Sequence, residues 1–275
     1  MAGCATAWRT EGCSQAVADR LLITCEHGGN EVPPEYAPLF AGHEEVLATH
    51  RGYDPGALEL ARQIATRFNA SLHFATTTRL LVELNRSAHH RRLFSEFAAS
   101  LDASARGELL DRFYRPYRAA VESAIADEVS RRHRVLHVSV HTFTPVLDGV
   151  VRTADIGLLY DPARPLERAF CDAWRDALRA ARNDLCVRRN YPYLGKSDGL
   201  TTFLRTRFDA GVYAGVELEV NQKWPTGNRA AWAALIPVIL DSLDRARGGF
   251  CAEKPWAKSR REPDLGPEHP RTATP

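Results

Sequence analysis

The sequence predicts a single α/β domain in which helices cover both faces of a mainly parallel β-sheet. Apolar, strand-like segments alternate with longer segments of helical periodicity along the chain. Such alternation is typical of strand–helix–strand units. The 275 residues, 44% of them hydrophobic, are enough for one large core, and we find no internal repeat or linker that divides them.

The individual elements follow from the spacing of hydrophobic residues. Short apolar or alternating runs predict strands over residues 20–25, 71–75, 80–84, 135–141, 156–160 and 212–220. Helical spacing predicts helices over residues 55–68, 103–132 (in one or two pieces), 165–181, 199–208 and 228–247. In the first helix, Leu58, Ala61, Ile64 and Phe68 fall on one face, and Pro55 suits the first turn.

The two ends of the chain are expected to lie outside the domain. We predict a disordered leader over residues 1–18 and a disordered tail over residues 248–275; the tail is rich in Pro and charged residues. The expected domain therefore covers residues 19–247.

Composition narrows the function. The net charge of +2 gives no reason to expect nucleic-acid binding. No segment approaches the roughly 18 apolar residues of a membrane span, and the first residues lack the pattern of a secretory signal. The six cysteines are scattered without a CxxC pair, which favours reduced thiols over disulfides or a Cys-based zinc site. We expect a soluble, cytoplasmic protein.

Several predicted strands end on ionisable residues. LLITCEHGGNEVP (residues 21–33) runs from a strand into Glu26, His27 and two glycines, and RVLHVSVHTFTP ends its strand on His141. Strand ends that lead into Gly-rich loops often carry ligand sites in α/β proteins. A strand followed by a turn, with His27 merely hydrogen-bonded, would explain the first pattern equally well.

Two further segments add carboxylates and an Arg. RLLVELNRS (residues 79–87) ends in Glu83, Asn85 and Arg86, and YAGVELEVNQKW places Glu217 and Glu219 on one face of a strand. Two buried Glu side chains need a partner or a metal, whereas an edge strand would leave that face solvated.

Together these residues suit a zinc-dependent hydrolase. Catalytic zinc commonly takes three His or carboxylate ligands and lowers the pKa of its bound water to about 7. A further carboxylate can act as general base, and Arg can bind a substrate carboxylate through two hydrogen bonds. The inventory fits hydrolysis of an amide in a small anionic substrate. No HExxH motif is present, so spacing alone does not identify the ligands.

Six motifs, in this order, resemble the N-formylglutamate amidohydrolase family over about residues 20–245: TCEHGGNEVP, HRGYDPGA, RLLVELNRS, SVHTFTP, RRNYPYLGKSDGLTT and VELEVNQ. The resemblance implies a fold similar to zinc carboxypeptidases and aspartoacylases, in which a mixed sheet lies between helix layers. It implies one zinc ion per chain and a zinc-bound water that attacks an amide. The expected reaction releases formate from N-formyl-L-glutamate in histidine degradation, or deacylates a related N-acyl amino acid.

The same resemblance suggests roles for individual residues. His27 and His141 match the metal histidines, and Asp54 is the preferred third ligand, with Glu26 and Glu31 as rivals, because Asn30 stands where carboxypeptidases have a Glu. Glu219 matches the general base, with Glu217 as second choice, and Glu26 could instead orient an imidazole. The remaining matches concern the substrate: Asn85 and Arg86 for its carboxylate, with Arg86 counted among the catalytic residues, Arg79 in support, Asn190, Tyr191 and Tyr193 nearby, and Lys196 and Thr201 as weaker candidates.

Other interpretations stay open at this point. A non-catalytic anion-binding protein of the same fold, or a carboxypeptidase for short peptides, would have similar motifs. We expect His137 to be a core or supporting residue, since buried histidines are more often hydrogen-bonded than metal-bound. The pair His89–His90 is expected in a lid or on a basic surface, and a nucleophilic Cys25 is disfavoured. The acyl group, the amino acid and the oligomeric state are not determined.

Overall fold

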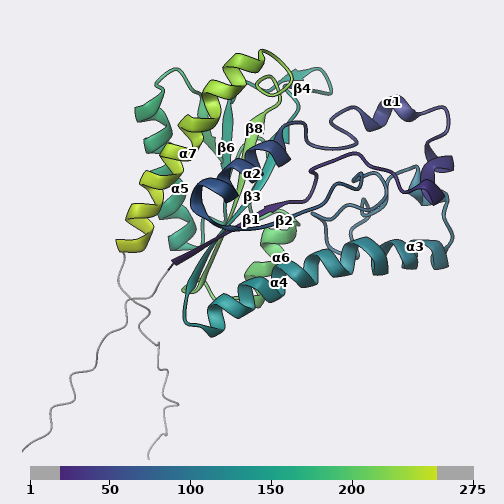
Figure 1. The fold of residues 1–275 in the computed structure, drawn as a ribbon, viewed down its shortest axis with the longest axis horizontal. Coiled ribbons are helices and arrows are strands. Elements are labelled where there is room, and N and C mark those ends of the chain that lie inside the picture. The colour runs from purple at the N-terminus through teal and green to yellow at the C-terminus, as the bar shows by residue number, and fades with distance from the viewer. Residues whose placement is uncertain (1–18, 253–275) are drawn as a thin grey trace, which may run out of the picture.

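A six-stranded β-sheet forms the middle layer of the molecule (Figure 1). The computed structural model describes residues 19–252. In spatial order the strands are β2 (Ser71–Phe74), β1 (Asp19–Cys25), β3 (Arg134–Phe143), β8 (Tyr213–Asn221), β6 (Ile156–Leu159) and β7 (Val187–Arg189). The first four are parallel to one another, whereas β6 is antiparallel to β8 and parallel to β7. The predicted single-domain fold with a mixed, mainly parallel sheet is confirmed.

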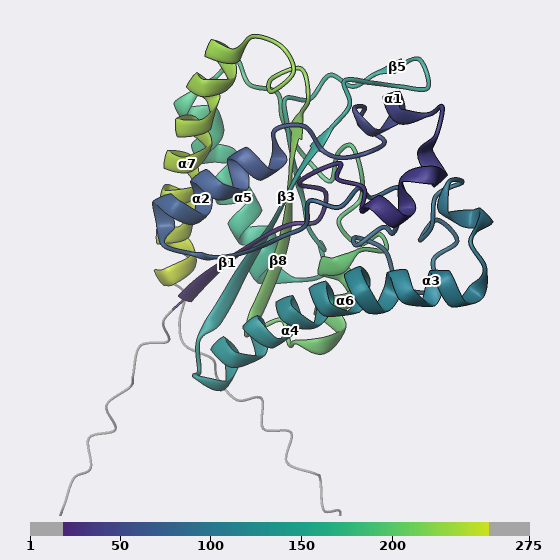
Figure 2. The same ribbon diagram turned by 45° about the vertical axis from the view of Figure 1, so that its right-hand side comes forward.

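Helices cover both faces of this sheet, as Figures 1 and 2 show. One layer consists of α2 (Ala57–Phe68), α5 (Pro165–Ala181) and α7 (Arg229–Ala252); the other contains α4 (Arg115–Ser130) and α6 (Leu200–Arg207). The first layer packs on the largest hydrophobic cluster, which includes the fully buried Trp174 and Trp232. The second layer covers a smaller cluster around Val121, Ile125 and Leu204.

The strands present two chemically different faces to these layers. Successive side chains of a strand point to opposite faces. In β3, Leu136, Val138 and Val140 belong to the large core, whereas His137, Ser139 and His141 point to the other face. The polar face therefore lies on the side of α4 and α6.

Segments between these elements build a wall beside the polar face. They include two short 3-10 helices, α1 (Glu44–Leu47), α3 (Ala103–Leu109), a π-helical turn that joins α3 to α4, and the hairpin of β4 (Val146–Leu147) and β5 (Val150–Val151). In Figure 2 this region extends away from α2, α5 and α7. Phe40, Leu81 and Leu109 are among the side chains that form its own small core.

Three differences from the predicted elements have physical causes. The apolar run 80–84 is not a strand; Leu81 and its neighbours are buried in a turn, where Leu93 and Arg118 satisfy the backbone of Glu83 and Leu84. Strand β7 was not predicted because its three residues include two exposed Arg. Helix α7 continues to Ala252, five residues past the expected boundary, and buries Phe250.

The predicted leader 1–18 and most of the predicted tail lie outside the described residues. Within residues 19–252, no helix is both long and apolar enough to cross a membrane.

Candidate metal centre and active site

The loop after β1 is packed so closely that only glycine fits at two positions. A Cβ atom on Gly28 would lie 2.8 Å from the carbonyl oxygen of Ala75, and one on Gly29 would lie 2.5 Å from that of Thr76. The Gly28 N–H donates to Ala75 O at 3.0 Å. The two glycines thus allow the chain to turn against the segment after β2, with His27 at the turn.

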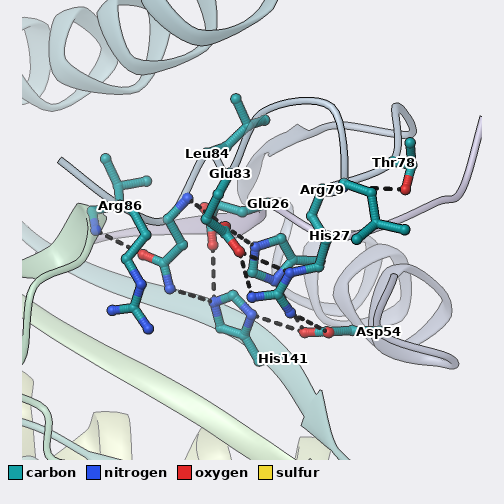
Figure 3. A network of polar contacts seen from close by, with 12 residues as sticks. Glu26, His27, Asp54, Thr78, Arg79, Glu83, Leu84, Arg86 and His141 are labelled. Carbon is teal, nitrogen blue, oxygen red and sulfur yellow. Dashed lines mark hydrogen bonds and ion pairs between the residues drawn. The ribbon is translucent and has the colours of Figure 1, made fainter. Parts of the chain in front are cut away.

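His27, Asp54 and His141 meet at the carboxyl ends of β1 and β3 (Figure 3). All three are buried, and one possible ligand atom from each lies within 4.8 Å of the others. Asp54 Oδ2 is 3.3 Å from His27 Nδ1 and 3.0 Å from His141 Nδ1. The structure therefore brings together the three residues expected to bind the metal.

Backbone contacts fix Asp54 between the two strands. Its N–H donates to the carbonyl oxygen of His27 at 2.9 Å, and its Oδ2 accepts from the N–H of Thr142 at 3.4 Å. The Thr142 hydroxyl donates to Pro55 O at 2.9 Å, just before α2 begins. Asp54 is thus tied to both histidine-bearing segments without being in a strand.

Two further carboxylates contact the Nε2 atoms of the two imidazoles. Glu83 contacts His27 Nε2 at very short range, and Glu26 Oε2 lies 3.0 Å from His141 Nε2. Metal-binding histidines commonly donate their other ring N–H to such a carboxylate. If these protons are on Nε2, both Nδ1 lone pairs face the Asp54 carboxylate, and a bound cation between them would then satisfy all three groups. Two imidazoles and a carboxylate are a ligand set that zinc accepts.

The pKa shifts of His141 and Asp54 both indicate that this cluster favours positive charge on its imidazoles and negative charge on its carboxylate. Burial alone would lower the pKa of His141, but hydrogen bonds to Asp54 and Glu26 outweigh it and hold that pKa well above its ordinary value. Burial would raise the pKa of Asp54, yet the charge of His27 and hydrogen bonds from both imidazoles keep it well below its usual range. The carboxylate is therefore ionised and the cluster attracts positive charge.

Arg79 joins the two carboxylates around His27. Its guanidinium donates to Asp54 Oδ1 at 3.2 Å through Nη1 and to Glu83 Oε2 at 2.8 Å through Nε. Burial opposes its charge, but Glu83 and Asp54 raise the pKa of Arg79 above its usual value. Arg79 was predicted to support binding of the substrate carboxylate, but these ion pairs favour a role in holding Asp54 and Glu83 in place.

Glu219 lies next to His141 on the adjacent strand β8, and its carboxyl group is buried without a full set of hydrogen bonds. The two residues are partners in the β3–β8 register. Glu219 is 5% exposed, and its Oε2 has no hydrogen-bond partner among the described residues. Burial raises the pKa of Glu219 to about 8 against the opposing effect of His141, with Asp54 and Glu217 contributing in the same direction as burial. Glu217 differs, because its Oε1 accepts from the Thr201 hydroxyl at 2.7 Å.

A close approach of backbone covers Glu219 from the side of β6. Gly157 is its register partner there, and a Cβ on Gly157 would lie 1.8 Å from Tyr191 O and 3.3 Å from Glu219 Cβ. The segment after β7 can therefore lie over this position only because residue 157 has no side chain.

A cavity of about 690 Å³ opens onto the metal residues and Glu219. Asn85, Arg86 and Tyr193, which were predicted to contact the substrate, all line this cavity. Asn85 Oδ1 accepts from Leu200 N at 2.7 Å, which leaves its amide nitrogen 3.4 Å from His141 Nε2. The Arg86 guanidinium donates to the carbonyl oxygen of Asp198, and Figure 3 shows it on the same side of the cluster as His141.

Asn190 lies elsewhere, and its predicted contact with substrate is not supported by its position. It does not line the cavity; its Oδ1 accepts from Tyr160 N at 3.1 Å and Gly195 N at 3.0 Å. These bonds hold the loop that presents Tyr193. Among the weaker candidates, Thr201 contacts Glu217, and neither it nor Lys196 lines the cavity.

The rivals for the third ligand lie away from the cluster of Nδ1 atoms. Glu31 is exposed and accepts from Thr76 Oγ1 at 2.6 Å. Glu26 orients an imidazole, as considered from the sequence, but the imidazole is that of His141 on β3 and not its neighbour His27. The pairing of Glu83 with His27 was missed. Its only signal was an acid between an apolar run and Asn85, and the partner is 56 residues away.

Two solved structures are similar to this chain in fold. A gene product of Agrobacterium tumefaciens has a similar structure, with a TM-score of 0.72 and 27% identity over 83% of this chain and 90% of that one. N-formylglutamate amidohydrolase from Ralstonia eutropha JMP134 shares the fold, with a TM-score of 0.62 and 19% identity over 86% of this chain and 96% of that one. No curated protein matches the sequence.

The family model for N-formylglutamate amidohydrolase matches residues 19–224. This range includes every strand of the central sheet and all of the residues that surround the metal centre. On the evidence of that match, the chain belongs to the N-formylglutamate amidohydrolase family.

Proposed function

We propose that the protein is a zinc-dependent amidohydrolase that cleaves the amide of a small N-acyl amino acid, such as N-formylglutamate. The observation that carries this proposal is the convergence of His27 Nδ1, His141 Nδ1 and the Asp54 carboxylate beside the unpaired, buried carboxyl of Glu219. Membership of an amidohydrolase family supports the reaction class.

His27, Asp54 and His141 would hold one zinc ion per chain. A zinc ion in such a site acts as a Lewis acid and lowers the pKa of water to about 7. Glu83 and Glu26 would hold the protons of the two imidazoles on Nε2, so that both Nδ1 atoms could bind the metal. Arg79 holds Asp54 and Glu83 in place.

Glu219 would move the proton. Hydrolysis joins the oxygen of a water molecule to the acyl carbon, breaks the bond from that carbon to nitrogen, and transfers one water proton to the leaving nitrogen. Glu219 Oε2 accepts this proton and returns it. A nearby cation would lower the pKa of Glu219 from about 8 toward neutrality, which suits a group that must both accept and donate.

Arg86 and Asn85 would bind the carboxylate of the substrate. Arg offers a planar pair of N–H donors that matches a carboxylate. Arg86 lies in the cavity with one donor engaged by Asp198 O, and the remaining donors are available for a ligand. Binding there would orient the amide with respect to the metal residues.

Metal analysis and a substrate panel test the proposal. We expect about one zinc per chain after purification, and chelator-sensitive hydrolysis of N-formyl or N-acetyl amino acids. A protein without bound metal that binds these compounds unchanged would favour the anion-binding alternative. Cleavage of short peptides in preference to N-acyl amino acids would favour the carboxypeptidase alternative.

A further inference from the structure

Exposed hydrophobic side chains gather at one place on the described surface. Six large hydrophobic residues between 19 and 252 are strongly exposed, and only Phe74 of β2 lies apart from the rest. The other five occupy the β4–β5 hairpin and the loop after β7: Val146, Val150, Val151, Tyr193 and Leu194. We call these five residues the apolar rim.

Two residues of the apolar rim, and Leu147 next to it, line the cavity beside His27, Asp54 and His141. Tyr193 and Leu194 line this cavity, and so does Leu147 of the hairpin. Arg152 joins the two segments, because it donates to Tyr193 Oη at 3.1 Å and stacks on the Tyr193 ring at 5.1 Å. Arg152 thus links the hairpin to the loop after β7 beside the cavity.

Side chains this exposed have a cost that a ligand can remove. Tyr193 is 46% exposed and Leu194 is 53% exposed, although both adjoin a polar site. Contiguous exposed apolar surface beside a cavity commonly marks a binding site. N-formylglutamate is polar at both ends and has no apolar group that would cover this rim. The rim would therefore stay exposed when that substrate binds.

We propose that the substrate carries an apolar group of several carbon atoms that packs on the apolar rim while its amide reaches the metal centre. This inference rests on the proposed amidohydrolase function and specifies its substrate class: N-acyl amino acids with an apolar acyl chain or an apolar side chain. Each methylene group that leaves water on binding adds to the affinity, so even partial cover of the rim favours an apolar substrate over N-formylglutamate.

Three substrates compared on the zinc-loaded protein test this inference: N-formylglutamate, N-hexanoylglutamate and N-formylleucine. We expect kcat/KM for one of the apolar compounds to exceed that for N-formylglutamate by at least about 10-fold. The second and third compounds distinguish an apolar acyl chain from an apolar side chain. A value for N-formylglutamate equal to or above both others would overturn the inference and leave the proposed function intact.

Variants locate the effect. Leu194→Ser and Leu147→Ser should each reduce the apolar-to-formylglutamate ratio of kcat/KM by at least about 5-fold. The matched control is Phe74→Ser, which changes an exposed hydrophobic residue away from the cavity and should leave the ratio unchanged. Equal ratios in all three variants would contradict the assignment of the rim.

Two further measurements keep the inference separate from the proposed function. If no compound is hydrolysed, calorimetric binding of the same three decides: tighter binding of an apolar compound by about 10-fold supports the rim, and equal binding overturns it. Light scattering checks the rival occupant, a second copy of this chain. A dimer in the native protein that Leu194→Ser converts to a monomer would overturn the substrate assignment.

Discussion

The two faces of β3 are equally buried but chemically opposite. On one face, Leu136 and Val138 pack under α2, α5 and α7 with almost no exposure. On the other, His137 and His141 are exposed by 0% and 3%. Depth of burial therefore does not separate core from site in this protein; the kind of contact does.

Each polar side chain of the second face has a specific partner on a neighbouring strand or helix. His137 is held by Thr24 and Tyr213, with both contacts at 2.8 Å. Ser139 donates to Glu26 at 2.6 Å. Buried polar groups are costly unless they are paired in this way. Glu219 on β8 differs: it lines the cavity, and its buried Oε2 has no partner among the described residues, which is why we propose it as the base.

Loss of an imidazole should have the largest effect. His141→Ala removes one of three proposed ligands, and we expect zinc affinity and kcat/KM each to fall by at least about 1,000-fold, since losing a mere supporting partner costs about 10–100-fold. Metal titration followed by calorimetry measures the affinity. His137→Gln, four residues earlier on the same face, is the control and should still bind zinc. Stoichiometric zinc in His141→Ala would refute the ligand assignment.

A core substitution on the adjacent strand should separate stability from catalysis. Leu218→Ala lies between Glu217 and Glu219 but points into the large core, where Leu218 is fully buried. We expect the free energy of unfolding to fall by about 2–5 kcal/mol, with zinc affinity of the folded protein nearly unchanged. Denaturant titration and calorimetry provide the two values. A loss of zinc affinity without a loss of stability would show that the two faces are not independent.

Glu219→Gln should separate metal binding from proton transfer. The amide keeps the size of the side chain but cannot accept a proton, so turnover should fall by about 100-fold or more while zinc is retained. The same change at Glu217, which is bonded to Thr201, should have a smaller effect on kcat. Near-normal turnover in Glu219→Gln would transfer the role of base to another group.

The smallest effect concerns the pH dependence of stability. Burial lowers the pKa of His137 to about 4 from its ordinary value of 6.5, although Glu26 opposes this shift. The unfolded chain then binds more protons between these values, so stability is full above pH 6.5 and declines as pH falls toward 4. From about pH 6.5 to 5.5 the native protein should lose about 1 kcal/mol more than His137→Gln. Identical pH profiles for the two proteins would exclude a neutral buried His137.

Much of the fold follows from local patterns, because strands and helices of this chain have strong hydrophobic periodicity. The run 80–84 shows the limit: Leu80 to Leu84 has the composition of a strand, but its backbone is satisfied by Leu93 and Arg118 from distant segments. Only three-dimensional packing distinguishes such a buried turn from a strand.

The candidate site is predictable to a similar extent. His27 and His141 stand at strand ends, and parallel strands bring such ends together, whereas Asp54 lies in a loop and was suggested by the family resemblance alone. The pairings of Glu83 with His27 and of Glu26 with His141 join residues 56 and 115 positions apart in sequence. No local pattern encodes such pairings.

Gly157 affects the pKa of Glu219 through the side chain that it lacks. Because the backbone of Tyr191 rests where a side chain would otherwise be, it lies close beside Glu219, which is 5% exposed. We expect alanine at position 157 to displace this cover, hydrate the carboxyl group and shift its titration toward that of an ordinary glutamate. One absent methyl group would thus help to set the pH at which Glu219 titrates.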